Sequence, residues 1–294
     1  MHKNLQNFIV HLSGILCLGF AFCFSSTSYA AETTNPPQRI ISLLPSLTET
    51  VCALGACNRL VGVDRYSNWP ESIAKLPRMG GGIDPNIESI VALKPDLVLM
   101  AGSARGVERL RALGLTVLTL EPKNYADVQH ALGVVAKVLG LPSQESDRVW
   151  REMNVQVEEI SKSIPQHAKA KRVYFEVSPV PFGASESSFI GETLQRLGAK
   201  NILSAAMGVF PQVSPEFVVR AQPDIIMVGD SNLADMQARP GWMNLQAMRT
   251  GRVCTFKPYE SGVLVRPGPR MVEAARLMST CLVDKAAPKV KPYP

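Results

Sequence analysis

Histidine is scarce in this chain. Its 294 residues include 4 histidines, and two of them fall in an N-terminal stretch that we expect to be removed. The two that remain, His130 and His167, lie on predicted helices or at their ends, so a three-histidine zinc or manganese site cannot be built. A zinc-binding pair of histidines four residues apart, a phosphate loop and a Gly-x-Ser-x-Gly elbow are also missing. The sequence therefore predicts no catalytic residue, no metal and no cofactor.

Clusters of positive charge are absent as well. The formal net charge is +6, but no run of lysine and arginine with interleaved aromatics is present. This argues against nucleic acid as a partner. After residue 30, no segment is long and apolar enough to span a bilayer.

The N-terminus does contain an apolar segment, from Phe8 to Phe24, after Lys3. Small residues follow it, Ser28 and Ala30, directly before Ala31. This is the pattern of a secretory signal with its cleavage site, so we expect residues 1–30 to be a cleaved signal peptide. A retained transmembrane anchor is the competing interpretation, but the apolar segment is short and interrupted by polar residues.

Cysteine is sparse in the mature chain. Two of the 6 cysteines leave with the signal, and an exported set of four allows three disulfide pairings. We prefer Cys52 with Cys57 and Cys254 with Cys281, because each pair is local within one half of the chain. Free buried thiols are the alternative.

Two stretches of the chain repeat one pattern. PNIESIVALKPDLVLMAG (85–102) aligns without gaps with SPEFVVRAQPDIIMVGD (214–230), so Glu88 matches Glu216 and Asp96 matches Asp224. LGACN (54–58) is echoed by LGAKN (197–201) in the same order. Two echoes in the same order indicate a duplicated architecture.

Each half alternates short apolar runs with helical segments, which is typical of a parallel sheet covered on both faces. The first helix is expected to have Ser46 or Thr48 as its cap and Glu49 in its electropositive first turn. Between the halves, Val149, Met153, Val157 and Ile160 form one apolar stripe on a long helix. We predict an α/β fold with two Rossmann-like lobes, residues 31–140 and 166–294. A single backbone helix, residues 141–165, joins the lobes, and a ligand cleft with nearly immobile walls lies between them.

Ligands of open α/β sheets bind beyond the carboxyl ends of the strands. The segments expected there are DRYSNWP (64–70), RMGGGIDP (78–85), SPVPFG (178–183), GVFPQ (208–212) and YESGVLVRPGPR (259–270), together with Pro45 and Ser46. Their aromatics, Tyr66, Trp69, Phe182, Phe210 and Tyr259, can present flat apolar faces to a ligand, or can be core residues and turn plugs. Arg266 can meet a ligand carboxylate, phosphate or amide, or can be a solvated surface residue.

These residues resemble a known family, over nearly the whole mature chain. RIISLLPSLTETVCALG, VGVDRYSNWP, IESIVALKPDLVL, FPQVSPE and RPGPR are similar to segments of periplasmic substrate-binding proteins of ABC importers with a helical backbone. That class serves cobalamin, haem and ferric siderophores, and the likeness is greatest to its cobalamin binders.

The resemblance implies that Tyr66 contacts a corrin-like ligand from the first lobe. Phe182 and Phe210 then pack on the ligand from the second lobe, and Arg266 reaches its polar periphery. It also implies that Glu88 and Glu216 dock onto arginines of the permease dimer in the inner membrane. Acids at helix N-termini also interact favourably with the helix dipole, which is the simpler explanation of each glutamate taken singly.

Four positions depart from the cobalamin binders. The positions of their two pocket tryptophans are occupied here by Gly82 and Phe210, and an aspartate that pairs with the arginine falls near Gly262. The cysteine that pairs in those proteins with the equivalent of Cys281 is replaced here by Leu197. The first three changes alter the shape and polarity of the pocket. A ferric ligand such as haem could use Tyr66 as an axial oxygen donor, with Met79 as a weaker partner.

The sequence is thus interpreted as a monomeric periplasmic binding protein, not an enzyme. Its cargo is a corrinoid such as vitamin B12 and its partner an ABC permease. Haem or a ferric siderophore is the alternative cargo. An exported metal-dependent hydrolase is the alternative of another class. Asp64 and Glu260 could serve an enzyme as an acid and base pair, but the sequence gives no reason to bring them together.

Overall fold

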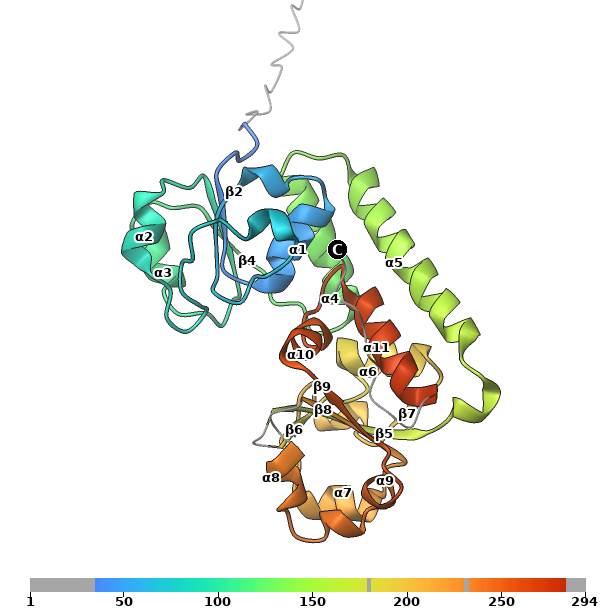
Figure 1. The fold of residues 1–294 in the computed structure, drawn as a ribbon. Coiled ribbons are helices and arrows are strands. Elements are labelled where there is room, and N and C mark those ends of the chain that lie inside the picture. Colours follow the sequence, from blue (N-terminus) through green and yellow to red (C-terminus); the bar gives the residue numbers. More distant parts are fainter. Residues whose placement is uncertain (1–34, 179–180, 230–232, 284–294) are drawn as a thin grey trace, which may run out of the picture. The chain divides into compact units, whose positions relative to one another are not determined.

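The computed structural model describes residues 35–178, 181–229 and 233–283, and Figure 1 shows its ribbon. The predicted signal peptide, residues 1–30, lies outside these ranges. Residues from Pro36 onwards form one compact unit with two β-sheets. Among the described helices, none combines the length and apolar character needed to cross a membrane.

The first sheet is parallel throughout, as predicted, with the strand order β2-β1-β3-β4. Its strands are β1 (Ile40–Ser42), β2 (Leu60–Val63), β3 (Leu97–Met100) and β4 (Val117–Thr119). The helices in this part of the chain are α1 (Pro45–Ala53), α2 (Ile87–Ala92) and α3 (Val107–Ala112). Every residue of β1 and β3 is buried, which explains why these strands are apolar almost throughout.

The second sheet has the order β6-β5-β8-β9, with β7 also paired to β5. Its strands are β5 (Arg172–Ser178), β6 (Phe182–Gly183), β7 (Lys200–Asn201), β8 (Ile225–Gly229) and β9 (Val253–Phe256). The helices here are α6 (Phe189–Arg196), α7 (Pro215–Ala221), α8 (Leu233–Gln237), α9 (Gln246–Arg249), α10 (Pro258–Leu264) and α11 (Met271–Val283). The predicted parallel sheet is confirmed for β5, β7, β8 and β9, and the two-residue edge strand β6 adds one antiparallel pairing, with β5.

Alternation along the strands sorts the apolar side chains into three clusters. In the first sheet, Ile41 packs with α2 and α3 on one face, whereas Ile40 packs with α1 and α4 (Tyr125–Val138) on the other. In the second sheet, Tyr174 packs on the side of α7, whereas Phe175 packs on the side of α6 and α11. The cluster around Ile40 and the cluster around Phe175 are one continuous core. The two sheets therefore share their inner packing.

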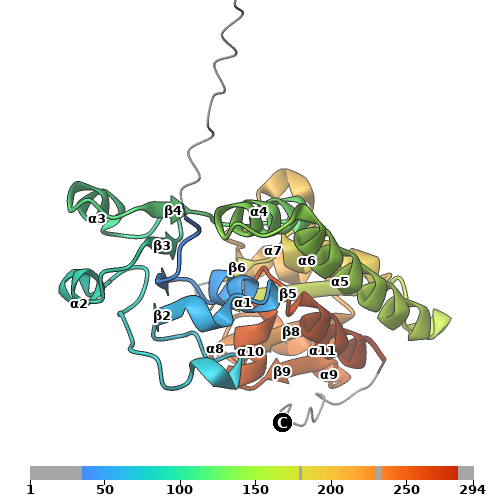
Figure 2. The same ribbon diagram turned by 90° about the horizontal axis from the view of Figure 1, so that it is seen from above.

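The long connecting helix is α5 (Ser143–Ser163), 21 residues in length. Val149, Met153 and Val157 of the predicted stripe are buried, and Ile160 packs against the same core. Helix α5 contacts α4, α11 and α6, and Figure 2 shows these helices gathered beside it. It thus bridges helices that pack on the two sheets, and the core that the two sheets share adds packing between the halves.

The repeated sequence pattern is repeated in the hydrogen bonding. Asn86 caps α2 by accepting from the Ser89 amide, and Ser214 caps α7 by accepting from the Phe217 amide. At the other end of each helix a guanidinium donates to a carbonyl, Arg39 to Leu93 in the first half. In the second half, Arg172 donates to the carbonyl of Ala221. The duplication therefore preserves both the start and the end of the helix that carries Glu88 or Glu216.

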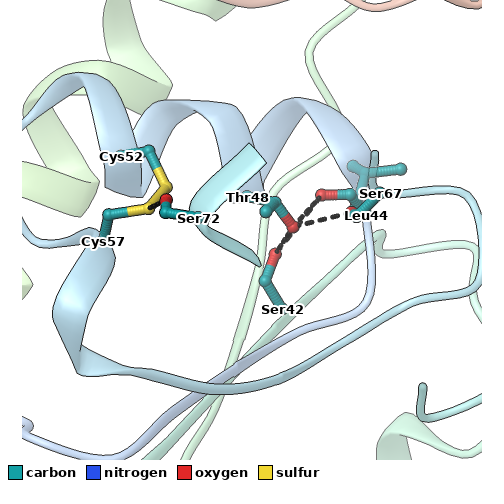
Figure 3. The surroundings of a disulfide bond; sticks show 7 residues. All are labelled: Ser42, Leu44, Thr48, Cys52, Cys57, Ser67 and Ser72. Carbon is teal, nitrogen blue, oxygen red and sulfur yellow. Dashed lines mark hydrogen bonds between the residues drawn. A yellow bond between two sulfur atoms is a disulfide. The ribbon is translucent and has the colours of Figure 1, made fainter. Parts of the chain in front are cut away.

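The start of α1 differs from the prediction. The helix begins at Pro45, and neither Ser46 nor Thr48 caps it. The Thr48 hydroxyl instead lies 2.9 Å from the hydroxyls of both Ser42 and Ser67 (Figure 3). Glu49 lies beyond the first turn, which contains no acidic residue, so the helix dipole does not explain it.

Two disulfides are present, Cys52 to Cys57 and Cys254 to Cys281. This is the local pairing preferred from sequence. The first ties the end of α1 to the loop before β2 (Figure 3). The second ties β9 to α11.

Helix α6 passes so close to the preceding loop that residue 191 must be glycine. A Cβ at Gly191 would lie 1.9 Å from the carbonyl oxygen of Ser185, a backbone atom that cannot move aside cheaply.

We expect Gly191→Ala to lower the free energy of unfolding by about 3 kcal/mol, measured by urea denaturation. Gly133→Ala in α4 is the matched control, because the methyl group it adds has open space for at least 4 Å around it. It should raise stability by about 0.5–1 kcal/mol. Equal effects of the two changes would contradict this packing.

Candidate functional site

A cavity of about 520 Å³ lies where the two halves of the chain meet. Its lining comes from the start of α1, the segment before α4, the end of β5, helix α6 and the segment after α10: Leu44, Ser46, Glu121, Pro122, Lys123, Val177, Phe189, Ile190, Phe210, Val265 and Pro267. Three strands, β1, β4 and β5, end at or just before this lining. The cavity thus lies at the carboxyl ends of parallel strands, where ligands of such sheets bind.

A second cavity of about 290 Å³ adjoins the first. The two share Leu44, Ser46, Val265 and Pro267, and the second adds Pro45, Tyr66, Gly262 and Arg266. The surface of this smaller cavity is almost entirely apolar. Apolar walls with a few placed polar groups are typical of small-molecule sites.

The structure brings some of the predicted ligand contacts to these cavities. Tyr66 lines the smaller one with 59% of its surface exposed. Phe210 lines the larger one and packs edge-to-face on Phe189, with ring centroids 6.1 Å apart. Aromatic surface from both halves of the chain therefore faces one continuous hollow.

Other predicted contacts lie elsewhere among the described residues. Phe182 is half-buried on strand β6 and Trp69 is half-buried beside Arg270, and neither lines these two cavities. Gly82 is also outside them, and a Cβ there would meet only the Ala104 side chain, at 3.7 Å. Tyr259 and Gly262 were expected in a loop, but both lie on helix α10. Met79 is 3% exposed in the core of the first half, so it is not available as an iron partner.

Arg266 is the charged residue of the smaller cavity, and it is 9% exposed rather than solvated. Its Nη1 atom donates to Glu49 Oε1 at 2.9 Å and to Asn68 Oδ1 at 2.7 Å. Its Nη2 atom donates to the carbonyl of Tyr66 at 2.8 Å. All three partners belong to the first half of the chain, so Arg266 fastens the segment after α10 onto α1 and the Tyr66 loop.

Arg270, which the sequence did not single out, completes the cluster. It is 5% exposed, lies 3.4 Å from Glu49 Oε1 and donates at 2.6 Å to Glu273 and to the Tyr259 hydroxyl. Its guanidinium also lies 5.4 Å from the Trp69 ring centre and 5.2 Å from that of Tyr259. Its place in RPGPR, four residues after Arg266, was the signal that could have identified it.

We call Glu49, Arg266 and Arg270 the clasp. Burial raises the pKa of the Glu49 carboxyl, and the two arginines oppose that rise. Burial disfavours the charged form of Arg270, but Glu49 and Glu273 outweigh it and raise the pKa of its guanidinium. The clasp therefore depends on mutual compensation of charges that burial alone would destabilise.

The loop that carries Tyr66 is held from a second side by Asp64, which is 1% exposed. Its carboxylate accepts from the Tyr66 amide at 2.8 Å and from the Ser67 hydroxyl. Burial raises the pKa of Asp64, against these hydrogen bonds. Glu260 is used differently, accepting from the Lys257 amide at the start of α10. Each carboxylate therefore accepts a hydrogen bond from a backbone amide of its own segment.

Glu88 and Glu216 line neither of these two cavities. Each occupies the second position of its helix, α2 or α7, and each side chain is exposed. Among the described residues, no ion pair involves either carboxylate. Both acids are thus presented to solvent at equivalent places in the two halves.

Comparisons with known proteins show which family has this architecture. Residues 40–260 match the family model described as periplasmic binding protein. The vitamin B12-binding protein of Pectobacterium atrosepticum is 30% identical over 261 residues, covering 86% of this chain and 91% of that protein.

Two solved structures are also similar. The periplasmic vitamin B12-binding protein of Vibrio cholerae has a TM-score of 0.68 and 26% identity, with 84% of this chain and 97% of that chain covered. The periplasmic heme-binding protein of Roseiflexus sp. RS-1 has a TM-score of 0.70 and 26% identity, with 84% and 98% covered. Because the family match spans well over half of the sequence, this chain belongs to the periplasmic binding proteins of ABC importers.

Proposed function

We propose that this protein captures a corrinoid in the two adjoining cavities and delivers it to an ABC permease. The observation that carries the proposal is the pair of cavities at the junction of the two halves, with Tyr66 on one side and Phe210 on the other. Volumes of 520 and 290 Å³, mostly apolar lining and few polar groups suit a bulky ligand with polar side arms. Relatives named vitamin B12-binding proteins support a corrinoid as that ligand.

In this proposal, residues 1–30 direct export to the periplasm and are removed. Residues 31–140 and 166–294 act as two lobes, with residues 141–165 as the backbone between them, and the mature protein is a monomer. Binding makes and breaks no covalent bond. We do not propose a hydrolase, because Asp64 and Glu260 hold the backbone of a loop and a helix instead of facing a common substrate position.

Haem is the second candidate cargo. One observation favours it: Tyr66 is 59% exposed and lines a cavity, so its phenol oxygen is open to a ferric iron. The similarity to a heme-binding protein is consistent with this candidate. A ferric siderophore would use the same oxygen-rich chemistry.

Calorimetric titration of the mature protein with cyanocobalamin and with hemin tests the cargo. We expect a saturable heat with cyanocobalamin and no shift of the Soret band of hemin. Tyr66→Ala should weaken the corrinoid affinity by about 1–3 kcal/mol, the usual cost of losing an aromatic contact. A tight hemin complex with a shifted Soret band, together with no corrinoid heat, would overturn the corrinoid assignment.

We further propose that Glu88 and Glu216 dock the protein onto its permease. Glu88→Lys and Glu216→Lys should leave ligand affinity unchanged, because both residues are exposed and outside the cavities. Each should slow transport about tenfold or more, since a reversed charge then meets a positively charged permease surface. The measurement is uptake of labelled ligand by proteoliposomes that contain the cognate permease.

Glu158→Lys is the matched control for docking. It makes the same charge change at an exposed position of α5, away from α2 and α7, and transport should stay near the unaltered rate. Loss of ligand binding in either docking variant would show that the assignment to the permease surface is wrong.

A further inference from the structure

Lys123 is a cation on the wall of the larger cavity. It lines that cavity next to Glu121 and Pro122, and it is exposed. In the part of the chain that the structure describes, no ion pair involves its ammonium group. A lysine acts as a compact point charge and commonly binds phosphate groups. Its position therefore makes it a contact for an anionic group of a ligand.

The backbone of Lys123 is held from two sides. Its amide donates to Asp127 Oδ2 at 2.9 Å, and its carbonyl accepts from the Phe189 amide at 2.8 Å. Phe189 begins α6 and lines the same cavity, so this hydrogen bond joins walls that come from the two halves of the chain. Because both polar backbone groups are used, the exposed part of Lys123 is its side chain. The base of a flexible four-carbon stem is thus fixed at the cavity wall, within reach of a ligand in the cavity.

The other charged residues that line the two cavities already have partners. The charge of Arg266 is matched by Glu49 at 2.9 Å. Both carboxylate oxygens of Glu121 accept hydrogen bonds from Ser103, Oε2 from its amide at 3.0 Å and Oε1 from its hydroxyl at 2.9 Å. Glu121 is thus directed to the loop after β3. Among the described residues that line the cavities, Lys123 is the cation left for a ligand anion.

We infer that Lys123 determines specificity by pairing with one anionic group of the ligand, the phosphodiester in the nucleotide arm of a corrinoid. The inference rests on the proposed corrinoid function and adds to it a residue and a ligand group. A corrinoid with its nucleotide arm carries one phosphodiester, which matches the one cation left. Haem carries two carboxylates, and the second would meet no further unmatched cation among the described lining residues and would lie in the same cavity as Glu121. The charges of the site thus favour a complete corrinoid.

Lys123→Met tests the pairing, because it removes the charge and keeps an unbranched side chain. Its effect is compared in calorimetric titrations with cyanocobalamin and with dicyanocobinamide, which has the corrin ring but no phosphodiester. We expect the cyanocobalamin affinity to fall about two- to fivefold, the effect of losing one ion pair that is open to solvent. The dicyanocobinamide affinity should stay the same, whereas a change in packing alone would weaken both ligands equally.

The salt dependence of binding is a second measurement. The Debye length falls from about 30 Å at 0.01 M to about 8 Å at 0.15 M ionic strength, which screens exposed charges. Over this range, the cyanocobalamin affinity of the unaltered protein should fall more than that of Lys123→Met. Lys137→Met is the matched control, because Lys137 is also exposed but lies in the last turn of α4 and lines neither cavity. Its affinities and their salt dependence should equal those of the unaltered protein.

The outcomes separate the role of Lys123 from the identity of the cargo. If the unaltered protein binds cyanocobalamin, equal weakening of both corrinoids by Lys123→Met, or weakening of neither, would overturn the pairing with the phosphodiester and leave the cargo standing. Failure of the unaltered protein to bind either corrinoid would overturn the proposed cargo. In that case hemin is titrated instead: a weaker hemin affinity in Lys123→Met would assign Lys123 to a carboxylate, and an unchanged one would overturn its role as an anion contact.

Discussion

The buried carboxylate of Glu49 holds two arginines from the opposite end of the chain, and the candidate site is built around that interaction. Arg266 and Arg270 lie in and directly after the segment whose Val265 and Pro267 line both cavities. Arg266 also donates hydrogen bonds to the carbonyl of Tyr66 and to the side chain of Asn68. Removing one partner of such a buried cluster typically costs about 3–5 kcal/mol, because the remaining charges lose their compensation. The clasp therefore defines a cleft wall, the position of an aromatic ligand contact and the connection between the two halves.

The local elements of the fold could be predicted from sequence because their signals are local. Apolar runs identified β1, β3 and β8, and the Val149 stripe identified α5 as a packed connector. Residues 259–264 were expected in a loop because they directly follow the last strand, yet Pro258 and the Glu260 cap start a helix there. The short antiparallel strand β6 gave no signal, since two residues carry no periodicity.

The clasp itself was beyond a local analysis. Glu49 and Arg266 are 217 residues apart in sequence, and the sequence alone assigned Glu49 to the first turn of a helix, where the dipole would have explained it. Arg266 was recognised as a lone cation in an apolar run, but its partner could not be identified without the fold. The same limit applies to Ser46, which at the start of a helix is indistinguishable in sequence from a cap. Only the completed packing shows that its hydroxyl has no partner among the described residues. Glu88 and Glu216 could be matched to each other from sequence alone, because the two stretches that contain them align without gaps. The structure adds that both helices have matching N-terminal caps.

A shared core, a helix that bridges both sheets and a charged clasp together predict a cleft that hardly changes on binding. The most direct measurement is the distance between spin labels on cysteines introduced at Arg109 of α3 and Arg220 of α7, both exposed, by double electron–electron resonance. The four cysteines of the described residues are joined in disulfides and do not take up label. The mean distance should change by less than about 2 Å on addition of cyanocobalamin. In Glu49→Leu the distance distribution should broaden, because both arginines lose their common partner. A larger ligand-induced shift in the protein with Glu49 intact, or an unaltered distribution in Glu49→Leu, would contradict a cleft held by the clasp.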